Sequence, residues 1–441
     1  MNLDLLKIKK VFFIGIGGIG ISAVARMMLL EGKTVLGSDI GENGITTELK
    51  NSDAVIFLGQ RLEFIPPDVD LIVYSIAIPK YDSKFFAELK NTFHIPILSY
   101  PQMLGIITTG KYTIAISGTH GKTTTTAMIA KVLIDSNHNP SVIVGSLLKD
   151  SKSNLVIGKS NFFVVEACEY ERSFLSIKPR ILIITNIETD HLDYYKDLKD
   201  IQRAFKELIL QTEDAVIFNK EDINANVLIQ EYQKSDPKTG VVDYSKYLDK
   251  VPKLSVPGIH NRMNAACALA VADLLNIKEE VAQKSLAKFS GTWRRLEKKG
   301  ETKEGTIIYD DYAHHPTEIK ASLQALRELY PKGKKNITLL FQPHLYSRTK
   351  AFFSDFVKSF KDADRILFLP IFFAREKKDE SVSSEMLAEN ISKNKEEARA
   401  FPDFESAEKF VSDLKLDSND VFVTMGAGEA YKVADKIFKL I

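Results

Sequence analysis

Short, continuous apolar runs alternate along the chain with longer stretches in which apolar residues recur at helical spacing. Short apolar runs are typical of strands buried on both faces, and the helical stretches between them predict crossover connections. The first run, residues 11–14, meets a glycine-rich turn, after which apolar residues continue at helical spacing until Gly32. The pattern predicts an α/β fold built on parallel sheets.

The order of strand, glycine turn and helix organises three successive segments. Predicted strands lie in "VFFI", "KTVLGSD", "AVIFLG" and "LIVYSIAIP", then in "YTIAIS", "NFFVVEACE", "RILIITNI" and "DAVIFN", and finally in "IIYDD", "NITLLFQPH", "RILFLPIF" and "VFVTMGAG". Prolines 96 and 101 close the first segment, and the charged connector "KKGETKEG" precedes the third. A chain of 441 residues is also too long for one core. We therefore expect domains at residues 1–104, 105–295 and 296–441.

Composition narrows the class of protein. The 59 basic and 58 acidic residues give a net charge of +1, which gives no reason to expect nucleic acid or a membrane surface as a partner. Cys168 and Cys267 are the only cysteines, so a disulfide framework and a paired-cysteine metal motif are excluded. The early apolar run, residues 11–30, contains several glycines and Arg26, and predicts neither a membrane span nor a signal peptide. We expect a cytoplasmic protein.

A first glycine loop, "GIGGIG", follows the first strand. Gly15, Gly17 and Gly20 form G-x-G-x-x-G before a helix, where backbone amides can hold a diphosphate. Asp39 follows at the distance of a ribose-binding acid in dinucleotide folds. The motif alone is weak, and a tight strand–helix turn without a ligand is the alternative. The corresponding rival function is a dehydrogenase with a nicotinamide cofactor.

A second glycine loop, "SGTHGKTTTT", contradicts that rival. Gly118 stands three positions before Gly121, with two residues between them instead of the four of the usual phosphate loop, and Lys122 and Thr123 follow. The glycines would let the backbone wrap phosphates, Lys122 would neutralise them, and the Thr123 hydroxyl would ligate Mg²⁺. A polar helix cap is the less favoured alternative.

Carboxylates and a histidine follow the next two strands. Glu166 ends an apolar strand, where a solvated acid is rare, and we interpret it as a Mg²⁺ ligand rather than a surface carboxylate. His191 is a candidate second metal or phosphate contact. Asp190 and Asp193 lie beside it, and one of them could instead cap the following helix.

Polar residues also gather in the last third of the chain. His260, Asn261 and Asn264 precede a predicted helix and alone would be capping residues. "WRRLE" carries paired arginines, whose guanidinium groups bind phosphate or carboxylate in two-point fashion. "DDYAHHPTE" and "FQPHLYSRT" place further Asp, His and Arg residues after strands, and we assign these segments to one site.

These motifs together resemble the Mur ligase family over essentially the entire chain. The matching segments, in the order of the family, are "GIGGIGISAVA", "SGTHGKTTTT", "EACEYERSFL", "TNIETDHLDYY", "GIHNRMNAACALA", "FSGTWRRLE", "DDYAHHPTE", "FQPHLYSRT", "AREKKDESVSS" and "MGAGEAYKVA". The shortened phosphate loop is that family's form. Two departures are visible: Cys168 stands where members often have Asp, and Leu345 where many have Arg.

The resemblance implies three domains: an N-terminal Rossmann-like domain for a UDP-sugar, a central P-loop ATPase-like α/β domain for Mg-ATP, and a C-terminal Rossmann-like domain that delivers the amino acid. It implies an ATP-dependent, ADP-forming amide-bond ligase of peptidoglycan precursor synthesis. The expected reaction joins L-alanine to UDP-N-acetylmuramate through an acyl phosphate. A recycling ligase that attaches a preformed tripeptide to the same nucleotide is the alternative. We expect a monomer or weak homo-oligomer.

The resemblance also implies roles for individual residues. The UDP-sugar contacts are Gly15, Gly17, Gly18, Ile19, Gly20 and Asp39. The ATP contacts are Gly118, Thr119, His120, Gly121, Lys122, Thr123, Thr124, His260, Asn264, Arg295 and Asp311. The Mg²⁺ ligands are Thr123, Glu166 and His191, and the amino-acid contacts are Tyr312, His314, His344 and Arg348. The catalytic set is Lys122, His191, His314 and Arg348.

Lys206 is a separate question. Several sister ligases carry a carbamoylated lysine at about this spacing from the histidine, but we expect Lys206 to be an exposed lysine on the helix "DIQRAFKELIL".

Overall fold

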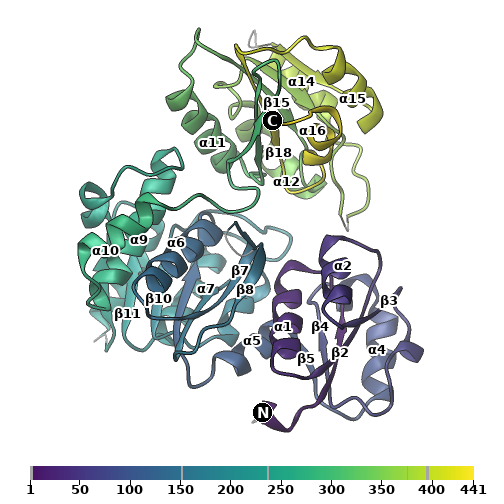
Figure 1. The fold of residues 1–441 in the computed structure, drawn as a ribbon, viewed down its shortest axis with the longest axis vertical. Helices are drawn as coiled ribbons and strands as arrows, with labels where there is room; N and C mark the ends of the chain where they lie inside the picture. Colours follow the sequence, from purple (N-terminus) through teal and green to yellow (C-terminus); the bar gives the residue numbers. More distant parts are fainter. Residues whose placement is uncertain (1–2, 150–151, 236–237, 375, 394–396) are drawn as a thin grey trace. The chain divides into compact units, whose positions relative to one another are not determined.

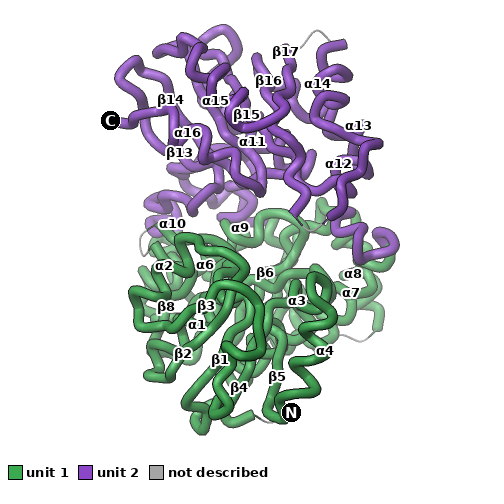
Figure 2. Tube along the Cα trace, turned by 90° about the vertical axis from the view of Figure 1, so that its right-hand side faces the viewer, with its two compact units in different colours: residues 1–188, 199–245, 267–282 green, residues 189–198, 246–266, 283–441 purple. Residues whose placement is uncertain are grey.

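The structure is a computed structural model that describes residues 3–149, 152–235, 238–374, 376–393 and 397–441. It contains three sheets flanked by helices (Figure 1), which confirms the three-domain α/β fold. The chain divides into two compact units (Figure 2): unit 1 comprises Met1–Glu188, Lys199–Ser245 and Cys267–Ala282, and unit 2 comprises Thr189–Leu198, Lys246–Ala266 and Gln283–Ile441. The predicted domain boundaries stay predictions.

The first sheet of unit 1 is entirely parallel, with the strand order β3-β2-β1-β4-β5. Its strands are β1 (Lys10–Ile14), β2 (Thr34–Asp39), β3 (Val55–Leu58), β4 (Leu71–Tyr74) and β5 (Ile97–Ser99). Its helices are α1 (Ile19–Leu30), α2 (Gly44–Asn51), α3 (Ile78–Tyr81), α4 (Ser83–Thr92) and α5 (Tyr100–Thr108). The strand order reverses beside β1, where an open α/β sheet binds its ligand. The predicted strand "LIVYSIAIP" is too long, because the chain enters α3 after β4.

The second sheet of unit 1 has the order β12-β11-β10-β6-β9-β7-β8. Its strands are β6 (Tyr112–Ser117), β7 (Ser141–Leu148), β8 (Ser153–Val156), β9 (Phe162–Glu166), β10 (Ile181–Ile184), β11 (Ala215–Phe218) and β12 (Gly240–Asp243). The associated helices are α6 (Lys122–Asp135), α7 (Leu198–Leu210), α8 (Ile223–Lys234), α9 (Ile259–Leu274) and α10 (Glu279–Ala287). The four predicted strands are β6, β9, β10 and β11, all apolar and mostly buried. The antiparallel hairpin β7–β8 was not predicted.

The sheet of unit 2 has the order β13-β14-β18-β15-β16-β17. Its strands are β13 (Glu297–Glu301), β14 (Ile307–Asp311), β15 (Asn336–Phe341), β16 (Arg365–Phe368), β17 (Glu397–Ala400) and β18 (Asp420–Met425). Its helices are α11 (Pro316–Leu329), α12 (Tyr346–Ala351), α13 (Phe353–Val357), α14 (Ser384–Ser392), α15 (Phe404–Asp413) and α16 (Tyr431–Ile437). The interpretation of "KKGETKEG" as a connector is wrong in its first half, because these residues form β13, an edge strand antiparallel to β14. Charged side chains are compatible with a sheet edge. Because β13 has no apolar run, the sequence pattern did not predict it.

Both faces of each sheet are covered, so the apolar strands lie in continuous cores. The strands are held in place by their buried apolar side chains. The loops at their carboxyl ends carry the polar motifs described above. Among the described residues, every helix is too short or too polar to cross a membrane.

Candidate active site

The first glycine loop leads from β1 into α1. Gly15 has a positive φ of 78°, and its amide donates to the Ser38 carbonyl at 2.8 Å. The Gly17 amide donates to the Asp39 carboxylate at 2.8 Å, and a Cβ at Gly17 would lie 2.9 Å from the same oxygen. No side chain caps α1 at Gly18, so the first amides of this helix face outward as they do in anion sites. Asp39 thus shapes the loop, and its contact with a sugar stays a prediction.

The second glycine loop joins β6 to α6, which begins at Lys122. Gly118 and Gly121 have φ values of 127° and 83°, in the region that favours glycine. A Cβ at Gly118 would lie 2.1 Å from the Thr185 hydroxyl oxygen, so a larger residue does not fit. The two glycines are required by backbone geometry as well as by any ligand.

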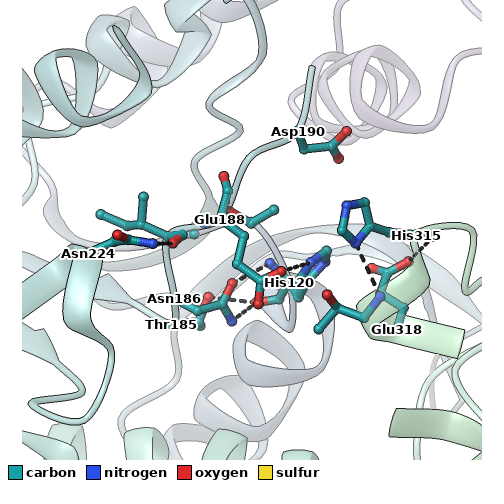
Figure 3. Close-up of polar contacts among 12 residues, drawn as sticks. His120, Thr185, Asn186, Glu188, Asp190, Asn224, His315 and Glu318 are labelled. Carbon is teal, nitrogen blue, oxygen red and sulfur yellow. Dashed lines mark hydrogen bonds and ion pairs between the residues drawn. The ribbon is translucent and has the colours of Figure 1, made fainter. Parts of the chain in front are cut away.

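Residues that follow β10 hold this loop in place (Figure 3). The His120 amide donates to the Asn186 side chain at 2.9 Å, and the Thr185 hydroxyl donates to the His120 carbonyl at 2.6 Å. The Glu188 amide donates to the Thr119 hydroxyl at 2.8 Å, and the Glu188 carboxylate lies 3.5 Å from Nε2 of His120. The predicted ATP contacts Thr119 and His120 are therefore tied by their own polar groups to the "TNIE" segment.

Lys122 has a buried ionic partner that the sequence analysis missed. Its Nζ lies 3.0 Å from the Glu169 carboxylate and donates to the carbonyls of Gly118 and Thr119 at 2.5 and 3.0 Å. Burial lowers the pKa of Lys122, but the ion pair with Glu169 and the nearby charge of Glu166 add to the other favourable interactions, and the net shift is upward. Lys122 is thus charged and aimed into the loop. Glu169 belongs to the segment "EACEY", in which the sequence analysis assigned a role only to Glu166.

A hydroxyl and a carboxylate meet beside Lys122. The Thr123 hydroxyl donates to Oε2 of Glu166 at 3.2 Å, and the Gly145 amide of β7 donates to Oε1 at 2.6 Å. Thr123 is buried, as is Thr124 in the same turn of α6. Two converging hard oxygens fit Mg²⁺. Of the predicted ligands, Thr123 and Glu166 are brought together in unit 1; His191 belongs to unit 2, and its part in the metal site stays a prediction.

His260 and Asn264 do not precede α9 but lie in its first turns, because α9 begins at Ile259. Burial lowers the pKa of His260 to about 4, and its Nδ1 has no hydrogen-bond partner among the described residues. Asn261 donates to the Pro257 carbonyl at 2.6 Å. A buried ring nitrogen without a partner is available to a polar ligand such as a purine.

The two arginines of "WRRLE" differ in environment. Arg294 is 3% exposed and donates to Asp310 at 2.7 Å and to the Gly426 carbonyl at 2.7 Å, so it joins β14 to the loop after β18. Arg295 lies over the Tyr312 ring, 5.0 Å from its centroid. Arg294 is thus engaged in structure, and a contact of Arg295 with nucleotide stays a prediction.

Asp311, a predicted ATP contact, is also buried. Its carboxylate accepts hydrogen bonds from the Ala313 amide at 3.1 Å and from the Ser322 hydroxyl. Burial raises the pKa of Asp311 to about 6. The two carboxylate oxygens thus accept one hydrogen bond from the loop "DDYAHH" and one from α11. A contact with nucleotide stays a prediction.

The four predicted amino-acid contacts come together in unit 2. Nδ1 of His314 lies 3.0 Å from the Tyr312 carbonyl oxygen, and the rings of His314 and His344 are 5.6 Å apart. Nη1 of Arg348 lies 3.1 Å from Nδ1 of His344. Burial lowers the pKa of His314 to about 4, so this imidazole is neutral at pH 7. Two segments about thirty residues apart in sequence thus form one cluster.

Asp190 completes this cluster. Its Oδ1 accepts hydrogen bonds from Nε and Nη2 of Arg348 at 3.2 and 3.0 Å. The two side chains line a cavity of about 440 Å³ together with His191 and Leu345. Leu345 has a φ of 73° and is buried, and its side chain forms part of the cavity wall. The cavity has the size of small-molecule sites.

The alternative that one of Asp190 and Asp193 caps the next helix is wrong. α7 begins at Leu198, well beyond both residues. His191 has a φ of 54°, and its amide donates to Asp190 at 2.7 Å. This local turn gives Asp190 a place beside Arg348 instead of at a helix end.

Lys206 is an exposed side chain on α7, as predicted. Its Nζ lies 3.2 Å from the Glu231 carboxylate of α8, and both side chains are about half exposed. Arg375 of "AREKKDESVSS" lies outside the described residues.

Known proteins match this chain over nearly its full length. Sequence models described as the Mur ligase family catalytic domain, middle domain and glutamate ligase domain match residues 10–112, 116–251 and 294–428. The UDP-N-acetylmuramate–L-alanine ligase of Clostridium kluyveri is 39% identical over 99% of each chain. The protein of that name from Caldanaerobacter subterraneus is 37% identical, covering 100% of this chain and 99% of its own.

Solved structures with a similar fold include two ligases. The UDP-N-acetylmuramate-alanine ligase of Thermotoga maritima has a TM-score of 0.79 and 27% identity, covering 97% of this chain and 98% of its own. A murein peptide ligase of Psychrobacter arcticus has a TM-score of 0.70 with 21% identity, covering 97% and 98%, and supports the fold alone. The chain belongs to the Mur ligase family.

Proposed function

We propose that this chain is an ATP-dependent ligase that joins L-alanine to UDP-N-acetylmuramate, with release of ADP and phosphate, in peptidoglycan precursor synthesis. Relatives at 37–39% identity over the full length carry the corresponding name. The observation that carries the chemistry is the trio of Lys122, Thr123 and Glu166 at a glycine loop, because it combines a fixed cation with hard oxygens.

The reaction needs ATP because a carboxylate oxygen is a poor leaving group. A carboxylate oxygen of the sugar attacks the γ-phosphorus, ADP leaves, and an acyl phosphate forms. Lys122, held by the carbonyls of Gly118 and Thr119, stabilises negative charge on the transferring phosphoryl group. Mg²⁺, when bound by Thr123, Glu166 and His191, would supply further positive charge to the phosphate oxygens.

The second step forms the amide. The L-alanine amine attacks the acyl carbon, the tetrahedral intermediate expels phosphate, and the nitrogen loses a proton. Arg348 would hold the amino-acid carboxylate through its paired N–H groups, and Tyr312 and His344 would close the pocket. His314, neutral at pH 7, can accept the proton of the amine.

The remaining roles concern nucleotide binding. We assign the diphosphate of the UDP-sugar to the amides at the start of α1, in the loop Gly15–Gly20. We assign adenine to His260 and Asn264, and the ribose or γ-phosphate to Arg295 and Asp311. A cytoplasmic location and a monomeric or weakly associated state remain predictions, the latter checked by sedimentation.

A panel of acceptors tests the function. Phosphate release is measured with ATP, Mg²⁺ and UDP-N-acetylmuramate in the presence of L-alanine, glycine, L-serine or L-Ala-γ-D-Glu-diaminopimelate. L-alanine should be preferred, with weaker use of glycine and serine, because one methylene or hydroxyl changes discrimination by about 1–3 kcal/mol. Preference for the tripeptide would establish the recycling ligase instead. Absence of phosphate release with every acceptor would reject both.

A further inference from the structure

The helix α5 connects two parts of the proposed site within unit 1. Its side packs so tightly against the segment Tyr170–Ser176, which follows Glu166, that a Cβ at Gly105 would lie 2.3 Å from the Ser176 carbonyl oxygen. Its first residue, Tyr100, contacts the first glycine loop. α5 therefore begins at the proposed diphosphate site and then runs beside the segment that follows the proposed metal ligand.

The Tyr100 ring lies against Gly20. A Cβ at Gly20 would lie 2.8 Å from Cζ and 3.0 Å from Oη of Tyr100, so glycine is needed for the ring to sit there. The start of α5 is fixed by a capping box, in which the Ser99 amide donates to the Gln102 side chain at 2.8 Å. The phenol is thus placed by backbone structure and not by a flexible loop.

The hydroxyl of Tyr100 makes no hydrogen bond to the described residues, and the residue is mostly buried. Burial raises the pKa of Tyr100, and the negative charge of Glu166 raises it further. The phenol therefore keeps its proton at neutral pH and remains a hydrogen-bond donor.

A UDP-sugar bound by this loop offers two kinds of anion: its diphosphate and, if it is the substrate proposed above, a carboxylate that must reach the γ-phosphate of ATP. The amides of α1 already serve the diphosphate. The phenol lies against Gly20, at the start of the helix that runs beside the segment following Glu166, and is placed for the carboxylate. Resting on the proposed function, we propose that Tyr100 donates a hydrogen bond to the lactyl carboxylate of UDP-N-acetylmuramate and so helps to select the carboxylated sugar.

Tyr100→Phe in the full chain tests this proposal, because it keeps the ring against Gly20 and removes only the hydroxyl. Binding of UDP-N-acetylmuramate and of UDP-N-acetylglucosamine, which lacks the carboxylate, is measured by calorimetry. Affinity for the first should fall about 10- to 100-fold, as expected for a hydrogen bond to a charged group, and affinity for the second should stay unchanged. In turnover, KM for UDP-N-acetylmuramate should rise while KM for ATP stays constant.

Tyr112→Phe is the matched control, because Tyr112 starts β6 at the end of the sheet opposite the phosphate loop. It should bind both nucleotides like the wild type. An equal loss for both nucleotides in Tyr100→Phe would mean that Tyr100 serves the diphosphate or the loop, and no loss would mean that it contacts neither; each result overturns the proposal. If the wild type itself binds no UDP-N-acetylmuramate, the proposed function fails with it.

Discussion

Arg348 and Asp190 form a buried ion pair, with Nη2 3.0 Å from Oδ1 and both residues 7% exposed. Burial raises the pKa of Asp190, but the Arg348 guanidinium and the neighbouring histidines together outweigh burial, so the net shift is downward and the carboxylate is ionised. Asp190 takes the edge formed by Nε and Nη2, and an arginine has five N–H donors. Nη1 lies 3.1 Å from Nδ1 of His344 and donates to the His344 carbonyl at 3.5 Å, so one N–H of Nη2 remains for the carboxylate of an amino acid.

Asp190→Asn should weaken use of L-alanine. The amide keeps one acceptor oxygen but loses the charge that orients Arg348, which corresponds to about 1–2 kcal/mol and a roughly tenfold rise in the KM for L-alanine. KM for ATP should stay constant in the same phosphate-release assay. Asp379→Asn is the control, because Asp379 lines the same cavity but pairs with the exposed Lys350. A lower KM for L-alanine would show that Asp190 competes with the amino acid instead of positioning Arg348.

Lys122→Ala should lower turnover by roughly 10²–10³-fold or more, the scale of one lost transition-state contact. It should also lower the free energy of unfolding by about 3–5 kcal/mol, because Glu169 would remain buried without its cation. Adding Glu169→Gln removes that uncompensated charge. The double variant should recover most of the stability, measured by urea unfolding, and none of the turnover. Recovery of turnover would remove Lys122 from the chemistry.

Sequence patterns predicted the features that depend on local chemistry. β6 and β9 are apolar because they are buried, and Gly118 is conspicuous because no other residue fits beside Thr185. Contacts between segments far apart in the chain could not be predicted, because the local sequence does not encode them. The sequence around Asp190 gives no sign that Arg348 contacts it, so the sequence analysis left open whether Asp190 or Asp193 caps the following helix. β13 stayed hidden for a related reason, since an edge strand needs no apolar pattern.

Glu166→Gln should raise the Mg²⁺ concentration needed for half-maximal activity. The amide keeps the hydrogen bond from Gly145 but is a weaker ligand for a hard cation than a carboxylate. Activity is titrated with Mg²⁺ at fixed free ATP. Glu213→Gln serves as control, because Glu213 pairs with Arg180 near the amino end of β10. Superimposable titrations of Glu166→Gln and wild type would exclude Glu166 as a ligand.

Lys206→Ala should leave turnover unchanged within about twofold. The ion pair of Lys206 with Glu231 is exposed, and such pairs contribute little to stability. Depletion of bicarbonate and CO₂ from the assay should likewise have no effect on the wild type. A loss of activity on depletion, restored by added bicarbonate, would instead identify Lys206 as a carbamoylated ligand.

Asp311 should make the stability of unit 2 depend on pH. Burial raises its pKa from the ordinary 3.8 to about 6, so the folded state binds the proton more tightly than the unfolded state does. The resulting stabilisation is fully present below about pH 4 and is lost as the pH rises through about 6. A pKa shift of this size corresponds to about 2–3 kcal/mol in the free energy of unfolding. His314, whose pKa is lowered to about 4, acts in the opposite direction over a similar range.

The contribution of Asp311 is isolated by comparison with Asp311→Asn, which is uncharged at every pH and leaves His314 in place. The unfolding free energy of the wild type, minus that of Asp311→Asn, should fall by about 2–3 kcal/mol between pH 4 and pH 7 in urea titrations. Ser322→Ala provides a second arm. Its hydroxyl donates to Asp311 and favours the ionised form, so its loss should raise the pKa of Asp311 and move the transition to higher pH. A difference that rises with pH would mean that Asp311 is stabilised as a carboxylate, with Arg295 as its partner.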